Sequence, residues 1–378
     1  MLVVFFTSLL AILLAYSDSF KKSGKGLESA FIIITFIGCI HYNYGNDYMG
    51  YYDIWQQING MSFKEVMWAE NIYGEKGWHV LNWVFTFSEY GFFFMVAFLQ
   101  IVQNFIFYRF IKKYLPPKHY WFGTLIYLMT TSLYLMNFSM MRQGFAGALF
   151  LAAFQILCPR SIPSKIKGKQ IKKTARLLLS ILIIYLATTF HTSAYICLPF
   201  LLLCLLPLNN IRPFLVGGIA LTVVLLLFKN ITSELMSYLF RYEALSIFGD
   251  RYNSVARSLG IGFILNSVPY VVCLVLLWKN ANTLHQEYKY LLFLALSGFI
   301  FTPISLVTTK MVGRITMYFL PFIIVAIPIS YNAIKDEKIR KLVSILYFLM
   351  TIYQYYGFFI SDTYGPRYME FHSIFEVL

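Results

Sequence analysis

The chain has 378 residues, of which 59% are hydrophobic and 13% are charged, and its formal net charge is +14. Soluble domains carry about 25% charged residues, so this composition excludes an ordinary soluble protein and indicates an integral membrane protein. The positive charge lies in short segments between apolar runs. Membrane topology and anionic lipid explain that distribution, so no nucleic-acid partner is expected.

Apolar runs recur along the whole chain, most of them long enough to cross a hydrocarbon core of ~30 Å as a helix. They predict an all-α polytopic membrane protein with about 12 transmembrane helices, forming a single domain over residues 1–378, with both termini on the outer side. The predicted spans are 2–16, 28–42, 91–108, 121–137, 141–158, 177–191, 193–206, 214–228, 261–278, 291–308, 312–331 and 342–360.

The charges between these runs predict the orientation. Six segments hold 21 of the 31 Lys and Arg residues but 5 of the 17 Asp and Glu residues, and they are 17–29, 109–119, 159–176, 207–213, 279–290 and 332–341. The positive-inside rule places them in the cytoplasm, the basic loop at about 159–176 among them. Two large loops, at about 43–90 and 229–260, then lie outside together with the 361–378 tail.

The segment 77–87 is too short to cross a bilayer and reads as amphipathic. We expect it to lie in the outer interface, with Trp78 and Trp83 at the level of the lipid headgroups. The five cysteines are all in apolar segments and form no C-x-x-C pair. The sequence therefore indicates no metal site, no cofactor and no disulfide framework.

Polar and ionisable residues gather on the predicted outer side. The stretch HYNYGNDYMGYYDIW at 41–55 opens the first outer loop, and Arg142 begins a span whose small residues at 144 and 146–148 allow close helix packing. The residues that stand out are Asp47, Tyr48, Glu75, Arg142, Gln143, His191, Asp250, Arg251, Arg314 and Tyr318.

Each of these residues also has a structural interpretation. An arginine near the end of a span reaches to the headgroups, a histidine in a turn can cap a helix, and tyrosines anchor loops at the interface. Charge in a membrane is nevertheless costly and tends to mark function. Because several separate segments offer such groups on one side and at one depth, a shared functional site is the preferred hypothesis.

Six short motifs follow one another between about residues 30 and 331: HYNYGNDYMGYY, EKGW, MRQGFAGA, FHTSA, DRY and GRITMYF. Their order and their common placement outside resemble the EpsG/Wzy-type bacterial polymerases of O-antigen, capsule and exopolysaccharide. That family commonly has an arginine where this chain has His41, so no anion-binding role is assigned to position 41.

The resemblance implies a GT-C-like architecture in the bacterial inner membrane, with the active site facing the periplasm. It implies an inverting, metal-independent glycosyltransferase whose donor and acceptor are undecaprenyl-diphosphate-linked oligosaccharide repeat units. The product would be a surface polysaccharide. A flippase and a chain-length regulator are the protein partners that the resemblance suggests.

The resemblance also implies roles for the residues on the predicted outer side. Arginines bind a leaving diphosphate through forked, charge-assisted hydrogen bonds, so the expected diphosphate ligands are Arg142, Arg314 and Arg251. The acceptor hydroxyl needs a base, for which His191 is favoured and Asp47 is the rival. The expected contacts to the substrate are Tyr48, Gln143, Glu75, Tyr318 and Asp250, and Glu75 is a third candidate for the base.

Two other functions stay open at this point. A metal-dependent GT-C enzyme with polyprenyl-phosphate sugar donors would use Asp47 and Asp53 as carboxylate ligands. A flippase or transporter of lipid-linked oligosaccharides would need ionisable residues along a path through the membrane midplane. The middles of the predicted spans contain almost no charge, so transport ranks last.

Overall fold

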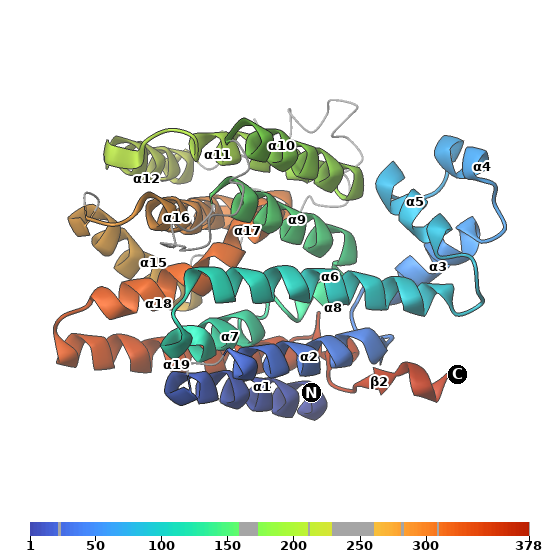
Figure 1. Cartoon of the computed structure of the whole chain (residues 1–378), viewed down its shortest axis with the longest axis horizontal. Coiled ribbons are helices and arrows are strands. Elements are labelled where there is room, and N and C mark those ends of the chain that lie inside the picture. The colour runs from blue at the N-terminus through green and yellow to red at the C-terminus, as the bar shows by residue number, and fades with distance from the viewer. Residues whose placement is uncertain are drawn as a thin grey trace. The chain divides into compact units, whose positions relative to one another are not determined.

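The computed structural model describes residues 1–21, 24–158, 173–210, 212–228, 261–280, 283–307 and 310–377. The chain forms two compact units, of which unit 1 comprises Met1–Leu201 and Thr351–Leu378 and unit 2 comprises Leu202–Met350. Both units are built from helices, as Figure 1 shows. In the described part of the chain, one two-stranded pairing is the only sheet. The all-α class is therefore confirmed, and the single domain stays a prediction.

Unit 1 consists of long helices that pack side by side and short helices that join them. Its helices are α1 (Leu2–Lys21), α2 (Lys25–Ile40), α3 (Tyr48–Ile58), α4 (Phe63–Trp68), α5 (Lys76–Val84), α6 (Gly91–Tyr114), α7 (Tyr120–Met129), α8 (Met136–Ser139), α9 (Met141–Leu157), α10 (Lys173–Phe190) and α20 (Gly365–Tyr368). Three 3-10 helices, η1 (Pro117–His119), η2 (Thr192–Ile196) and η5 (Ile374–Glu376), and the strands β1 (His41–Tyr42) and β2 (His372–Ser373) complete it. α1 packs on α2 and α7, and α6 on α2 and α9.

Unit 2 has the same helical character. Its elements are η3 (Leu208–Asn210), α12 (Arg212–Leu227), α15 (Ile261–Asn280), α16 (Gln286–Val307), α17 (Lys310–Phe319), η4 (Leu320–Phe322) and α18 (Ile323–Ala333). Two helices, α11 (Cys197–Leu203) and α19 (Glu337–Phe359), contribute residues to both units. Within unit 2, α16 packs on α12, α15, α17 and α18.

Among the described residues, five helices are long and apolar enough to cross a membrane: Leu2–Lys21, Gly91–Tyr114, Lys173–Phe190, Gly313–Ala333 and Glu337–Phe359. The chain is thus a multi-pass membrane protein. About 12 spans, as expected from the apolar runs, stay a prediction. The predicted loop at 229–260 and most of the basic loop at 159–176 lie outside the described residues.

Two of the predicted spans are not continuous helices. The run 121–137 is interrupted between Met129 and Met136, where Thr130, Thr131 and Ser132 form turns. Serine and threonine side chains offer the backbone local hydrogen bonds that compete with a helix. The run 193–206 holds η2 and then α11, whose 7 residues reach only about 10 Å at 1.5 Å per residue. Neither run therefore forms one continuous helix of the length that the sequence predicted.

Basic segments gather at one end of unit 1. The hydroxyl of Ser19 donates to the carbonyl of Lys118 at 3.4 Å, which joins the segments 17–29 and 109–119. Tyr114 at the end of α6 donates to the carbonyl of Cys158, directly before the segment 159–176. The first residues of α6 and α9 and the last residues of α10 therefore lie at the opposite end, which we call the site end.

The short helices α3, α4 and α5 form a group beside the start of α6 (Figure 1). Gly45 has a φ of 128°, and a Cβ there would lie 2.8 Å from the carbonyl oxygen of Phe138, so this turn requires glycine. Gly77 in α5 meets Thr189 of α10 so closely that a side chain would collide with it. These contacts fix the 43–90 segment to the site end of the long helices.

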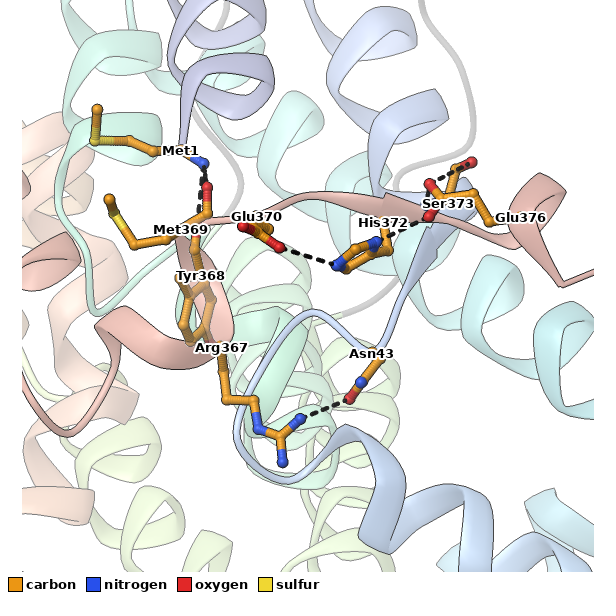
Figure 2. Close-up of polar contacts among 9 residues, drawn as sticks. All are labelled: Met1, Asn43, Arg367, Tyr368, Met369, Glu370, His372, Ser373 and Glu376. Atoms are coloured by element: carbon orange, nitrogen blue, oxygen red, sulfur yellow. Dashed lines mark hydrogen bonds and ion pairs between the residues drawn. The ribbon is translucent and has the colours of Figure 1, made fainter.

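The 361–377 tail, here named the C-terminal clasp, lies on the same end. β2 pairs antiparallel with β1, with His41 opposite Ser373 and Tyr42 opposite His372. Arg367 donates to Asn43 at 3.4 Å, and the His372 ring lies 2.8 Å from the Glu376 carboxylate. Figure 2 shows these contacts, with His372 between Glu370 and Glu376. The nitrogen of Met1 bonds to the carbonyl of Tyr368 at 3.2 Å. The tail and the start of the 43–90 segment therefore share one side of the protein.

Candidate active site

Arg142 is the second residue of α9, at the site end of unit 1, and it is 6% exposed. Gly144, two residues further along α9, lies against Asn137 and Gln103, and a Cβ there would meet the Asn137 side-chain oxygen at 2.5 Å. Close packing of this kind holds the start of α9 deep among its neighbours. The guanidinium of Arg142 forms an ion pair with Glu75, with 2.7 Å between Nη1 and Oε2.

Glu75 connects α9 to the end of α10. It precedes α5 as its N-terminal cap residue, but its carboxylate bonds no backbone group of that helix. Its Oε1 accepts instead from the backbone N–H of Thr192 at 2.9 Å and from the Thr192 hydroxyl at 3.3 Å. The Glu75 side chain is therefore not a cap of α5, because the carboxylate points to the ion pair and to the turn after α10.

His191 is the residue before Thr192, so the same turn places it near Glu75 and Arg142. It is 6% exposed, and its Nδ1 lies 2.7 Å from the hydroxyl oxygen of Ser193. Glu75, Arg142 and the His191–Thr192 turn thus come from three distant segments and meet at one place. Sequence placed each on the outer side, and the structure brings these three together.

Two tyrosine rings flank the guanidinium of Arg142. Its central carbon lies 4.5 Å from the ring centre of Tyr73 and 5.9 Å from that of Tyr51. Such contacts stabilise the cation. Burial raises the pKa of Tyr51 to about 12, although nearby Arg142 acts in the opposite direction. The sequence singled out neither tyrosine individually, although Tyr51 belongs to the tyrosine-rich stretch 41–55 and stands one helical turn after Asp47.

Asp47 and Tyr48 begin α3 and have contrasting surroundings. Asp47 is exposed, and the hydroxyl of Ser139 lies 3.4 Å from its Oδ2. Ser139 stands three residues before Arg142 in the chain. Tyr48 is fully buried, donates to the carbonyl of His41 at 3.2 Å and packs against Phe92. In this structure its ring faces protein, and its contact with a substrate stays a prediction.

The other predicted site residues are Gln143, Arg314, Tyr318, Asp250 and Arg251. Gln143 is 3% exposed within α9. Arg314 and Tyr318 belong to α17 of unit 2, where Arg314 is half-buried and Tyr318 is 1% exposed. Asp250 and Arg251 lie outside the described residues. A joint grip of Arg142 and Arg314 on one ligand therefore stays a prediction.

Helix α5 carries further polar groups toward this cluster. Trp78 is 0% exposed, so the expectation that it anchors at headgroup level was wrong: its ring packs on Tyr51 inside unit 1, with 5.0 Å between ring centres. His79 and Asn82 share its buried face. The signal for them in the sequence was a spacing of four residues, from Glu75 to His79 and from Trp78 to Asn82, which places each pair on one helix face. In the described ranges, no group of three His, Cys, Asp or Glu residues could hold a metal ion.

Comparison with known proteins adds the family. No curated protein and no solved structure matches the chain. The sequence model of the EpsG family matches residues 28–372, which is nearly the whole chain and includes every residue of the Glu75–Arg142 cluster. The chain belongs to the EpsG family, a Wzy-type family of polysaccharide polymerases.

Proposed function

We propose that this polymerase joins undecaprenyl-diphosphate-linked oligosaccharide repeat units into a surface polysaccharide at the outer face of the bacterial inner membrane. The observation that carries the proposal is the buried Arg142–Glu75 ion pair at the site end, opposite the basic segments. A buried cation that faces the outer side suits a lipid diphosphate held at the membrane surface. The proposed architecture is GT-C-like, and the reaction is inverting and metal-independent.

The ion pair suits a leaving diphosphate because the two partners can separate without leaving Glu75 unpaired. When the diphosphate takes the guanidinium fork, Glu75 keeps its bonds to the N–H and hydroxyl of Thr192. Arg142 would then stabilise negative charge that grows as the glycosidic bond breaks. Arg314 and Arg251 are proposed as further diphosphate ligands.

The transfer itself needs one proton acceptor and one displacement. The acceptor hydroxyl oxygen attacks the anomeric carbon of the donor, the bond from that carbon to the diphosphate oxygen breaks with its electron pair on the diphosphate, and the hydroxyl proton passes to a base. His191 and Asp47 are the candidates for this base among the residues that the sequence singled out. Tyr48, Gln143, Tyr318 and Asp250 are proposed to contact the sugars. A flippase would supply the repeat units, and a chain-length regulator would act on the product.

The decisive experiment uses the purified full-length protein in liposomes, with lipid-linked repeat units extracted from cells that lack the gene. We expect a ladder of lengthened, lipid-linked chains from the wild type and none from Arg142→Ala. Loss on addition of a chelator, restored by Mn²⁺ or Mg²⁺, would instead favour the metal-dependent enzyme. Translocation of the repeat unit without lengthening would favour a flippase.

Orientation is tested separately by labelling single cysteines introduced at exposed positions. Glu65 lies in the 43–90 segment and Lys118 at the basic end. We expect Glu65→Cys to react with a membrane-impermeant thiol reagent in intact cells, and Lys118→Cys to react only after the membrane is opened. The reverse pattern would contradict the outward-facing site. The wild-type protein with its five native cysteines is the control.

A further inference from the structure

The buried face of α5 carries polar atoms that the protein itself does not satisfy. Trp78, His79 and Asn82 are 0%, 1% and 0% exposed. The amide nitrogen of Asn82 donates to the carbonyl of Trp78 at 2.8 Å, but Trp78 Nε1, both ring nitrogens of His79 and Asn82 Oδ1 have no hydrogen-bond partner. The carbonyl of Tyr73 approaches the His79 ring without hydrogen-bond geometry. Buried polar groups are nearly always paired, so these atoms point to a ligand.

The side chains of Arg142, Trp78 and His79 all lie close to Gly74. A Cβ at this position would lie 3.1 Å from Arg142 Nη1, 3.2 Å from Trp78 Cδ1 and 3.5 Å from His79 Nε2, and Arg142 Nε is likewise buried without a partner. Gly74 is half-buried and has a φ of 125°. Because it has no side chain, the Arg142, Trp78 and His79 side chains can pack closely against its backbone. We call Gly74, Trp78, His79 and Arg142 the Gly74 cluster.

The unpaired atoms have the chemistry that a sugar hydroxyl requires. Trp78 Nε1 and Arg142 Nε can only donate, Asn82 Oδ1 can only accept, and a neutral histidine does both. A hydroxyl both donates and accepts, whereas a diphosphate oxygen only accepts. The aromatic rings of Tyr51, Tyr73 and Trp78 add the flat apolar surfaces on which sugar rings pack. The cluster thus fits a saccharide beside the diphosphate at Arg142.

We infer that His79 is a catalytic residue of the proposed polymerase, the base that takes the proton from the acceptor hydroxyl. This inference rests on the proposed function. As the hydroxyl oxygen bonds to the anomeric carbon, its proton moves to the unprotonated ring nitrogen of His79 and the electron pair of the broken bond leaves with the lipid diphosphate. The imidazolium then returns its proton to water.

The surroundings keep His79 in the form that can accept a proton. Burial lowers the pKa of His79, since the charged ring is poorly solvated there, and Lys76 and Arg142 act in the same direction. The Tyr73 carbonyl opposes this lowering of the pKa with an effect second only to burial, and Glu75 opposes it with the smallest effect. His191, by comparison, already has its Nδ1 engaged at 2.7 Å from Ser193.

The test measures initial rates of chain lengthening against pH in the liposome assay, for the wild type and for His79→Gln. The wild-type rate should fall on the acid side of an ordinary histidine pKa of ~6.5, because His79 protonates only below its normal range. His79→Gln should lose activity by about 10²-fold or more and its residual rate should lack this acid limb, with donor binding unchanged. The exposed His285→Gln is the matched control and should behave as the wild type.

Two further variants keep the inference testable if His79→Gln folds poorly. His79→Ala should regain part of its activity with added imidazole, which a purely structural role would not produce. Gly74→Ala should lose activity because it places a methyl group against His79 and Arg142. Gly60→Ala should not, although Gly60 also has a positive φ of 90°, because no atom lies within 4 Å of its added Cβ.

The results separate the inference from the proposed function. Full activity of His79→Gln, an unchanged acid limb, or equal rates for Gly74→Ala and Gly60→Ala would each reject His79 as the base. Imidazole rescue of His191→Ala and not of His79→Ala would transfer the role to His191. If the wild type lengthens no chains from its lipid-linked repeat units, the proposed function fails, whatever the His79 variants do.

Discussion

The C-terminal clasp and the Glu75–Arg142 cluster both lie at the site end of unit 1. Their polar groups differ in exposure and in hydrogen bonding. In the clasp, Arg367 bonds to Asn43 and Glu376 bonds to both His372 and the N–H of Ser373, all at exposed positions. In the cluster, the Arg142 and Glu75 side chains are 8% and 18% exposed, and α5 buries several polar atoms without a partner.

The difference separates polar groups that support the fold from those kept for a ligand. Exposed, paired groups contribute little to stability and can be replaced with small effect. Buried groups that lack partners weaken the fold, so their presence needs another reason. On this ground we propose that the clasp is a structural strap for the 43–90 segment and that the cluster is the functional site.

The largest expected effect comes from Arg142→Lys. A lysine keeps the charge but loses the planar fork that grips a diphosphate, so the rate of polymerisation should fall by about 10²-fold. The liposome assay measures this rate. Arg367→Lys in the clasp is the matched control and should leave the rate unchanged. Equal rates for the two variants would remove the distinction between the two regions, and a normal rate for both Arg142→Lys and Arg314→Lys would reject the diphosphate grip.

A smaller effect is expected from Glu75→Gln. The amide oxygen can still accept from Thr192, but the Arg142 guanidinium loses its partner charge in a largely buried place. We expect a cost of about 1–3 kcal/mol in the free energy of unfolding and a rate about 10-fold lower. Thermal unfolding in detergent and the same assay measure the two quantities. Glu65→Gln, an exposed capping residue, is the control and should change neither; a similar loss there would show a general response to lost acidic charge.

The smallest effect concerns the clasp and pH. The backbone N–H of Ser373 and the His372 ring lower the pKa of Glu376, so its carboxylate favours the folded clasp. That contribution is complete above the unfolded carboxyl pKa of ~4.3 and is lost as the pH falls through the lower folded value. Hydrogen exchange at the Ser373 amide should therefore lose protection only in acid, and Glu376→Gln should abolish this pH dependence. Equal protection at all pH values would show that the carboxylate does not hold the strap.

Much of the site was accessible from the sequence, within limits that have a physical origin. Glu75, Arg142 and His191 stand out because ionisable residues next to apolar runs are rare and costly. Their mutual contacts were not predictable, because 67 residues separate Glu75 from Arg142 and 117 separate Glu75 from Thr192. His79 and Tyr73 were missed because their role depends on what packs over them.

What the sequence by itself determined is the helical membrane class and the separation of basic segments from the site end. Both follow from local properties: a bilayer forces its spanning backbone into helices, and positive charge stays on the cytoplasmic side. The tertiary structure alone decided which segments meet. It buried Trp78 and Tyr48 and turned the Glu75 carboxylate from its helix to Arg142, because packing among distant helices outweighs the local preferences of a short stretch.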